Sequence, residues 1–570
     1  MSPLTFNIIR QSTQRSAARR GTVVMSNQAS TTSGDREPII PDRTVAVSPK
    51  KRMIETPGCF MYSVKGSVPH FTPDTLRQQE LGGVSVSIEH MLQDHQPAGF
   101  DKWSFSLSKF LNLQDFILFC DVRDTSRYFR VPINTDRYIS MMTHQGVRQL
   151  TLEEYLKIVR AYAPDIMATF TDSISDLELT EQGKLLGSST GQKRVRKSVD
   201  RSLKWLDQIL KERQGIDTLA EDRVKGQARK KTVGEHQTSH TTNATAANSN
   251  DIVNEAISTA TTTTTAKAWT DVSVFAHVGG AQIEQERIRS AEETAKRQGV
   301  DGFIVDTLTL PGTKDEVLNL LKISLDHLPS EKPRLVYGMQ TPEDVLKSIA
   351  LGADIFDTSY PFQLTEGGKA SLYSFGPSSP LSTSSSKRWI NLWDEEHADK
   401  FVPLLDGCEC YACKGGRHTR AYINHLLKAH EMLATVLLMS HNMHQYSKFF
   451  ENVRQSIQDG TFEQYSDSFM EQFGTEPERT GEIHQAQAAV EAALLRRNRL
   501  DVLDDIENAA SLDKAKATAA AEEIKRQKMQ MREARRAKMK EEGLKRKLQH
   551  DLIKQQRLNQ EIESKGQEEN

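Results

Sequence analysis

The sequence predicts an α/β fold built on a parallel β-sheet, and two observations carry this prediction. Short apolar runs of the kind found in strands buried on both faces recur along the chain, and helical patterns separate them. Alternation of strand and helix indicates a parallel sheet whose faces are covered by helices. Periodicity alone does not separate an open sheet from a closed barrel.

The expected strands are six apolar runs, at 115–120, 165–170, 272–278, 302–308, 334–339 and 353–359. Two helix starts between them have a clear physical basis. Thr151 and Glu154 have the spacing of a capping box, in which each side chain satisfies a backbone amide at the other residue. Thr341 is followed by Pro342 and two acids, which suits the first turn of a helix.

Composition divides the chain into a foldable middle, residues 51–474, and two polar ends. Residues 1–50 are rich in Ser, Thr and Arg, and no acidic residue precedes Asp35. We expect a disordered, flexible arm there. An Arg-rich, acid-poor end is also typical of a mitochondrial targeting segment, so mitochondrial association is the alternative.

Two stretches inside the middle region, 213–268 and 376–387, are polar and nearly free of bulky apolar residues, which predicts disordered surface insertions. Residues 475–570 contain many strong helix formers and predict a long charged helical tail. Between Ile524 and Lys547 the tail carries eleven Lys or Arg against three Glu. Such a run is either a solvated helix face or a surface that attracts phosphates.

Global properties exclude some classes of protein. The formal net charge is −2 and gives no general sign of nucleic-acid binding. No run of eighteen apolar residues exists, so we expect no membrane-spanning helix. The N-terminus lacks the apolar core of a secretory signal, which favours a reducing compartment such as the cytoplasm.

Three of the five cysteines, Cys408, Cys410 and Cys413, lie within six positions, whereas Cys59 and Cys120 are isolated. An odd total with one tight cluster favours a metal site over a disulfide framework. Three thiolates leave a tetrahedral zinc ion one ligand short, and the usual fourth ligand is a histidine. The candidates downstream are His418, His425, His430, His441 and His444.

Two of these histidines deserve comparison. His418 lies five residues past Cys413, on a Gly-Gly turn, and is sterically able to reach the cluster. His441 is the stronger candidate, but a single helix from Cys413 would place it about 42 Å away. The chain must therefore fold back, and 428–430 is the expected corner between two helical stretches.

The stretches CECYAC, TRAYINHLLKAHE and LLMSHN resemble the zinc site of the tRNA-guanine transglycosylases. The resemblance implies a TIM-type (β/α)8 barrel with an inserted zinc-binding subdomain at about 390–455. It also selects His441, which precedes Asn442, as the fourth zinc ligand beside Cys408, Cys410 and Cys413. The turn 414–418 is about two residues longer than in the family, which leaves His418 as the weaker alternative.

The same resemblance implies base exchange in tRNA, in which a carboxylate attacks the ribose C1′ and expels guanine. Asp357 stands where the family has its nucleophile, although Asp354 lies close by in sequence. Asp172 is similar in place to an Asp that contacts the base. The loops that catalytic members use for proton transfer and base recognition are absent. We therefore expect no catalytic residues and a vestigial Asp357.

Four further stretches, at 56–76, 193–210, 331–346 and 353–372, resemble a non-catalytic eukaryotic branch of the family. The match covers roughly residues 55–455 apart from the two insertions. It implies a zinc-bearing subunit that forms a heterodimer with a catalytic queuine tRNA-ribosyltransferase paralogue and acts on tRNA. The alternatives are an independently active transglycosylase that uses Asp357, and a structural zinc module in an RNA-binding scaffold.

Overall fold

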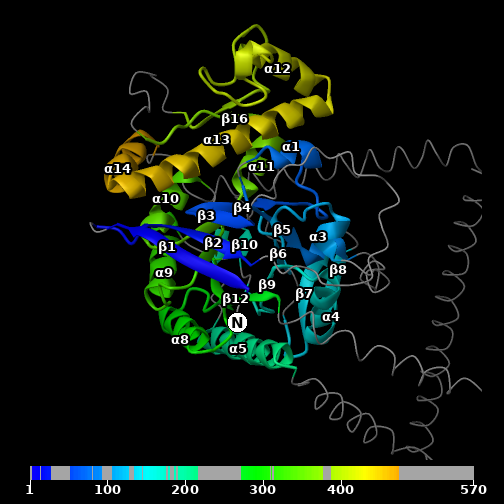
Figure 1. Cartoon of the computed structure of the whole chain (residues 1–570), viewed down its shortest axis with the longest axis vertical. Helices are drawn as coiled ribbons and strands as arrows, with labels where there is room; N and C mark the ends of the chain where they lie inside the picture. Colours follow the sequence, from blue (N-terminus) through cyan, green and yellow to red (C-terminus); the bar gives the residue numbers. More distant parts are fainter. Residues whose placement is uncertain are drawn as a thin grey trace, which may run out of the picture. The chain divides into compact units, whose positions relative to one another are not determined.

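The computed structural model describes residues 3–12, 15–26, 52–79, 81–92, 106–126, 134–143, 146–174, 177–179, 185–187, 191–215, 271–308, 310, 313–339, 341–376 and 387–473. Its centre is a closed barrel of eight parallel strands, the TIM-type barrel that was expected (Figure 1). In chain order the strands are β4 (Gly58–Tyr62), β5 (Gly83–Ser87), β6 (Ile117–Asp121), β9 (Ile166–Ala168), β12 (Ser273–Val278), β13 (Gly302–Asp306), β14 (Arg334–Tyr337) and β15 (Ile355–Asp357).

The six strands expected from apolar runs are all present, and β4 and β5 were missed. β4 is a short strand that begins directly after Pro57. β5 reads GVSVS, with serines in place of the bulky residues that mark a buried strand, yet all five residues are buried. One of these serines, Ser85, uses its carbonyl to accept a hydrogen bond from the hydroxyl of Ser63, at 2.6 Å.

Each barrel strand is followed by a helix, as the alternating pattern predicts. The helices are α1 (Pro73–Arg77), α2 (Ile88–Met91), α4 (Leu152–Tyr162), α5 (Gln192–Arg213), α8 (Glu284–Ala295), α9 (Lys314–Asp326), α10 (Pro342–Ala350) and α11 (Ser359–Glu366), with α3 (Leu107–Phe110) between β5 and β6. Two hairpins, β7–β8 (Tyr138–Thr143 and Gly146–Thr151) and β10–β11 (Leu177–Leu179 and Leu185–Gly187), extend the loops after β6 and β9.

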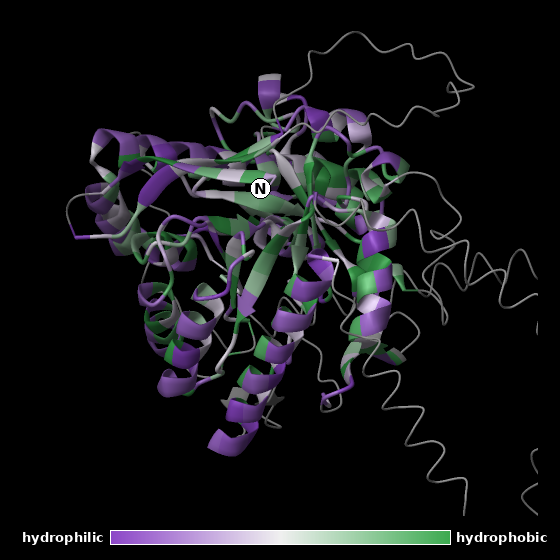
Figure 2. Ribbon diagram, turned by 60° about the horizontal axis from the view of Figure 1, so that its bottom comes forward, coloured by the Kyte–Doolittle hydropathy of each residue, from purple (hydrophilic) through white to green (hydrophobic). Residues whose placement is uncertain are grey.

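Both predicted helix starts are confirmed. The Thr151 hydroxyl accepts the amide of Glu154 at 3.2 Å, and the Glu154 carboxylate accepts the amide of Thr151 at 2.9 Å. Thr341 caps α10 by accepting the amide of Asp344 at 3.3 Å, and Pro342 occupies the first turn. Figure 2 shows the resulting division, with hydrophobic residues along the strands and hydrophilic residues on the outer faces of the helices.

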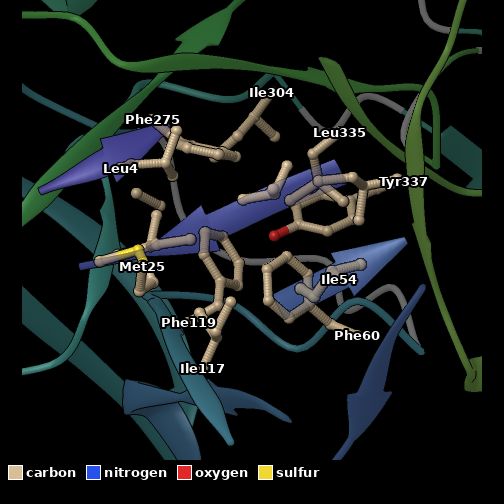
Figure 3. Close-up of a cluster of buried hydrophobic side chains, with 14 residues drawn as sticks. Leu4, Met25, Ile54, Phe60, Ile117, Phe119, Phe275, Ile304, Leu335 and Tyr337 are labelled. Carbon is tan, nitrogen blue, oxygen red and sulfur yellow. The ribbon is translucent and has the colours of Figure 1, made fainter. Parts of the chain in front are cut away.

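A three-stranded antiparallel sheet closes the amino-terminal end of the barrel. It consists of β1 (Leu4–Gln11), β2 (Arg19–Met25) and β3 (Met53–Thr56). Side chains of this sheet join those of the barrel strands in one buried cluster, and Figure 3 shows Leu4, Met25 and Ile54 beside Phe60 and Phe119.

The expectation of a flexible arm over residues 1–50 was therefore wrong for β1 and β2. The segment was judged by its Arg and Ser content, but alternate residues of β2, including Val23 and Met25, are buried against the barrel, and so is Leu4 of β1. Arg19 is also buried and pairs with Asp354, with 2.7 and 2.6 Å between the guanidinium nitrogens and the carboxylate oxygens. Residues 27–51 lie outside the described residues.

The chain after β15 builds a second layer of structure on the barrel. β16 (Lys369–Ser371) pairs with β17 (Trp389–Asn391), and the short helices η2 (Glu395–His397) and η3 (Lys414–Gly416) follow. Helices α12 (Arg420–Lys428), α13 (Met432–Asp459) and α14 (Phe462–Phe473) complete this part, and α12 and α13 are drawn in yellow above the barrel strands in Figure 1.

The predicted insertions and the predicted tail are not tested, because 216–270, 377–386 and 474–570 lie outside the described residues. Among the helices that the structure does describe, none is both long enough and apolar enough to span a membrane.

Candidate metal centre and the mouth of the barrel

The structure brings Cys408, Cys410, Cys413 and His441 together in one buried group. The three cysteines lie in the turns between β17 and α12, and His441 lies on α13. The Nδ1 atom of His441 is 3.7, 3.5 and 3.4 Å from the Sγ atoms of Cys408, Cys410 and Cys413. None of the five cysteines of the chain forms a disulfide.

These distances fit a single tetrahedral metal ion. Bonds of about 2.3 Å to sulfur and about 2.0 Å to nitrogen would separate sulfur and nitrogen by about 3.5 Å. The imidazole is also oriented for ligation, because Nε2 of His441 lies 2.8 Å from the carbonyl oxygen of Ser371. A proton held at Nε2 by this acceptor leaves the lone pair of Nδ1 facing the three sulfur atoms.

The contacts within the group shift the pKa values of its members in opposite directions. Hydrogen bonds from Cys410 and Cys413 lower the pKa of the Cys408 thiol. Burial lowers the pKa of His441, but its contacts with Cys408 and Cys413 outweigh burial and raise that pKa to about 9. A metal ion bound here displaces protons from these ligands, so its affinity rises with pH.

The chain reaches this geometry by folding back where the sequence predicted. Helix α12 ends at Lys428, His430 has a left-handed backbone with φ of 58°, and α13 begins at Met432. His418 does not join the cysteines. Its ring lies between those of Tyr411 and Tyr422, with centroids 5.9 and 5.8 Å away. His441, and neither His425, His430 nor His444, completes the group among the described residues.

Asn442 fixes α13 against the small sheet beside the cluster. Its Oδ1 accepts the backbone amide of Ser371 at 2.9 Å, and its Nδ2 donates to Lys369 O at 2.9 Å and to the hydroxyl of Thr365 at 3.0 Å. Two adjacent residues on α13 therefore hold the backbone of Ser371. His441 contacts the Ser371 carbonyl, and Asn442 accepts the Ser371 amide. This explains why His and Asn occur as a pair in the sequence.

The carboxyl ends of the barrel strands form the mouth where active sites of this fold are built. Asp357 is the last residue of β15 and is buried. Burial raises its pKa to about 6, against the effect of hydrogen bonds from Ser359. One of these runs from the Ser359 amide to Asp357 Oδ1 at 2.8 Å. Asp354, the rival in sequence, lies before the strand and is bound to Arg19.

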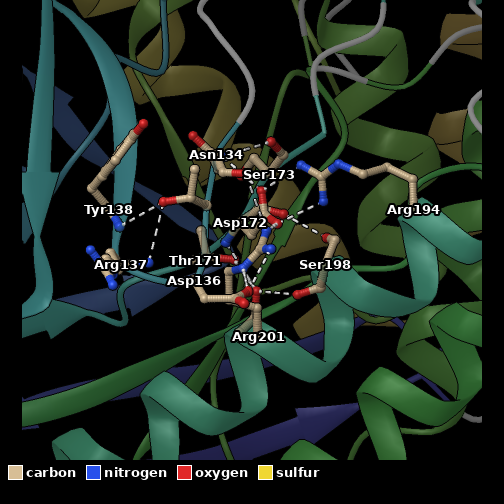
Figure 4. A network of polar contacts seen from close by, with 12 residues as sticks. Asn134, Asp136, Arg137, Tyr138, Thr171, Asp172, Ser173, Arg194, Ser198 and Arg201 are labelled. Atoms are coloured by element: carbon tan, nitrogen blue, oxygen red, sulfur yellow. Dashed lines mark hydrogen bonds and ion pairs between the residues drawn. The ribbon is translucent and has the colours of Figure 1, made fainter. Parts of the chain in front are cut away.

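Asp172 follows β9 at the mouth, and its carboxylate is fully engaged by protein groups (Figure 4). Arg194 binds both oxygens, at 2.8 and 3.0 Å, and Arg201 binds Oδ2. Asn134 donates to Oδ1 at 2.7 Å. Asp172 therefore anchors α5 and does not offer a free carboxylate to a bound base.

Sequence reasoning missed a second set of polar residues at the mouth. Asp121 ends β6 and accepts a hydrogen bond from the hydroxyl of Tyr337, at 3.0 Å. Nε2 of His277 lies 3.5 Å from the other oxygen of Asp121. Asp306 ends β13, and burial raises its pKa. The sequence did contain a signal for these residues, because the apolar runs ILFCD and GFIVD each end in an acid.

Glu89 and His90, on α2, also lie together with Asp124, in the loop after β6. Burial is the main cause that raises the pKa of Glu89, to about 7. The Asp124 carboxylate accepts hydrogen bonds from the Tyr62 hydroxyl at 2.9 Å and lies 2.8 Å from Nε2 of His90, and Glu89 accepts the Asp124 amide at 2.8 Å. These contacts join α2 to the loop after β6, and they occupy both oxygens of Asp124 and one oxygen of Glu89.

The chain therefore belongs to the class of TIM-type barrel proteins with an added metal-binding subdomain. Its metal-ligand group is a Cys3His set, and carboxylates line the mouth of its barrel. The chain belongs to the queuine tRNA-ribosyltransferase family, because the model of that family matches residues 42–231 and 237–475.

Within this family, the chain is similar to proteins that share one name. It is 30% identical over 443 residues to queuine tRNA-ribosyltransferase accessory subunit 2 of Gallus gallus, covering 72% of this chain and 88% of the relative. It is 29% identical to the proteins of the same name in Xenopus tropicalis, with 72% and 91% covered, and in Homo sapiens, with 71% and 89% covered.

Proposed function

We propose that this chain is the non-catalytic, zinc-binding subunit of a heterodimeric queuine tRNA-ribosyltransferase. In this role it supports the exchange of guanine for queuine at the anticodon wobble position of tRNA without performing the exchange. The observation that carries the proposal is the state of Asp172. The carboxylate that would face a base at the mouth of the barrel is instead held by Arg194, Arg201 and Asn134.

Zinc is the metal that suits the Cys3His group best. Thiolate and imidazole ligands in a tetrahedral arrangement favour zinc over calcium or magnesium, which prefer oxygen ligands. Four protein ligands leave no position for water or substrate, so the ion supplies folding stability to the subdomain and no reaction step. Cys408, Cys410, Cys413 and His441 would hold it.

The mouth of the barrel supports a silent role. A nucleophilic carboxylate is effective only where the leaving base is bound and protonated. Asp357 is present at the end of β15, but it is buried and already accepts a hydrogen bond from Ser359. A site whose second carboxylate, Asp172, is neutralised by two arginines cannot match the polar edge of a purine.

The surface of the metal subdomain supports pairing with another protein. It carries six of the ten large hydrophobic side chains that are exposed among the described residues: Phe401, Val402, Tyr411, Tyr422, Met432 and Leu433. We name these six residues the apolar surface of the metal subdomain. Exposed apolar residues concentrated in one part of a protein mark an interaction site. The partner proposed for it is a catalytic member of the same family.

The test is incorporation of labelled guanine into tRNA by the chain alone, by a catalytic family member alone and by the two together. The proposal expects activity only when the catalytic member is present, and more activity with both. Robust exchange by the chain alone would favour an independently active enzyme that uses Asp357, whose pKa of about 6 leaves it mostly ionised at neutral pH. Stable tRNA binding with no effect on exchange would favour a structural scaffold.

A further inference from the structure

We propose that one face of helix α5 binds the phosphate backbone of RNA. The proposal rests on the proposed function, because it takes tRNA as the RNA. The face consists of Lys193, Arg196, Lys197 and Lys204, all exposed. We name these four residues the basic face of α5.

The helix separates its basic residues into two sets with different tasks. Arg194 and Arg201 turn inward to Asp172, as Figure 4 shows, and Ser198 donates to the carbonyl of Asp172 at 2.7 Å. This anchor fixes the first turns of α5 to the end of β9. The helix that carries the basic face of α5 is therefore fixed to the barrel, which lowers the entropic cost of binding a ligand.

The charge of the basic face is not cancelled by the acids on the same helix. Asp200 pairs with Arg289 at 2.7 Å, and Asp207 pairs with Arg297 at 2.7 Å. Both arginines come from α8 or the residues just after it. Among the residues that the structure describes, none of the four side chains of the basic face forms an ion pair.

One exposed carboxylate reports the positive field beside this face. The hydrogen bond from Arg201 lowers the pKa of Asp136, and the charges of Lys204 and Lys197 contribute in the same direction. The nitrogen of Arg201 lies 2.7 Å from Asp136 Oδ1. The positive groups of α5 therefore already stabilise one anion at this surface, the carboxylate of Asp136.

The basic residues in the first turns of α5 destabilise the helix. The first turn of an α-helix carries partial positive charge, which favours acids there and disfavours bases. Helix α5 begins after Gly191 with no side-chain cap and no acid in its first turn, and places Lys193, Arg194, Arg196 and Lys197 there and just beyond. A bound polyanion would relieve this repulsion.

The location suits a substrate that lies across the mouth of the barrel. α5 starts just beyond the carboxyl end of β9, and Asp357 ends β15. In the order β12-β13-β14-β15-β4-β5-β6-β9 these two strands are four positions apart, so they stand on opposite sides of the closed barrel. RNA that extends beyond the mouth on the β9 side meets the basic face of α5.

The chemistry of the face favours phosphates over bases. Its exposed positions carry long side chains with positive charge and no aromatic ring on which a base would stack. From Lys193 to Lys204 the face spans about 16 Å, the length over which a nucleic-acid strand presents several phosphates. We therefore expect contact that is independent of sequence and sensitive to salt.

The test is binding of a fluorescently labelled, unmodified tRNA transcript to the full chain, alone and with a co-expressed catalytic family member, between 50 and 200 mM KCl. The test variant changes Lys193, Arg196, Lys197 and Lys204 to Gln. The matched control changes Lys157, Lys296, Lys322 and Lys347 to Gln, which removes the same charge from surface pairs on other helices.

The test variant should bind tRNA about tenfold to a hundredfold more weakly at 100 mM KCl, with a salt slope shallower by about 3. Its melting temperature should stay the same or rise, because the repulsion in the first turns of α5 is removed. The control should keep nearly all of its affinity.

Four results would overturn the proposal. Equal affinity of the test variant and the unchanged chain would show that α5 does not contact RNA, while leaving the proposed function intact. Equal loss in the control would show only an effect of net charge. Loss of pairing with the catalytic member, with tRNA affinity kept, would reassign the face to a protein contact. An unchanged chain that binds no tRNA in either form would remove the proposed function as well.

Discussion

The Nε2 atom of His441 on α13 lies 2.8 Å from the carbonyl oxygen of Ser371 on β16, so one hydrogen bond ties the proposed fourth metal ligand to the small sheet above the barrel. The ligand and the architecture of the subdomain are therefore coupled. Loss of the metal should loosen the whole cluster of buried residues that surrounds the three cysteines.

His441→Ala or Cys410→Ser should abolish stoichiometric zinc binding, because a tetrahedral site that loses one of four protein ligands is no longer closed. Zinc per chain, measured by elemental analysis, checks this. His418→Ala is the control, since that ring lies between Tyr411 and Tyr422 outside the metal-ligand group, and it should keep one zinc per chain. Full zinc content in both ligand variants would rule out this ligand set.

Phe401→Glu should weaken pairing with the catalytic member at least tenfold, because it places a charge on the apolar surface of the metal subdomain, where the side chain is 79% exposed. Analytical ultracentrifugation measures the change. Phe110→Glu, at a side chain 49% exposed on the barrel, is the matched control and should pair normally. Similar pairing of the two variants would contradict the proposed interface.

Asp357→Asn should leave the rate of guanine exchange by the heterodimer unchanged within about twofold. Under the proposed function this chain lacks the groups that bind and protonate the leaving base, so removal of the Asp357 carboxylate forfeits no transition-state stabilisation. The matching Asp of the catalytic member is the positive control and should be essential. A hundredfold drop on Asp357→Asn, or about 2.7 kcal/mol, with zinc and pairing intact would show an active site in this chain.

The same variant should change stability in a manner that depends on pH. The folded chain raises the pKa of Asp357 from 3.8 to about 6, so ionisation opposes folding. The penalty is absent below about pH 4, grows between pH 4 and 6, and is complete above pH 6, where it reaches about 3 kcal/mol. Asn accepts the same hydrogen bond without this charge.

Thermal melting at pH 5 and pH 7.5 tests this expectation. Asp357→Asn should stabilise the protein at pH 7.5 and do so less at pH 5. An equal shift at both values would show that the effect comes from packing and not from ionisation.

Arg19→Ala should destabilise the protein by about 3 kcal/mol or more, because it leaves the buried Asp354 carboxylate without its partner. Arg15→Ala is the control, since Arg15 is 79% exposed in its pair with Asp467 and should contribute less than about 1 kcal/mol. Chemical denaturation of both variants measures the difference. Equal and small effects would show that the amino-terminal sheet is not anchored by this pair.

The sequence by itself determined the local features. Bulky apolar runs gave six barrel strands, Thr151 and Glu154 formed the capping box, and the chain folded back between α12 and α13. The spacing of Cys408, Cys410 and Cys413 identified one side of the metal site. These features depend on neighbours in the chain, which the sequence displays directly.

Tertiary structure decided what depends on residues far apart. Only the closed barrel brings Leu4, Val23 and Met25 under its strands and turns a segment expected to be flexible into part of the core. Serines in β5 are buried because one face of that strand points into the closed barrel and the other lies under the helices that surround it. Asp172 became an anchor only because α5, which begins twenty residues later, directs Arg194 and Arg201 back to it. A charge in the sequence has a sign, but its partner, and therefore its role, is set by the fold.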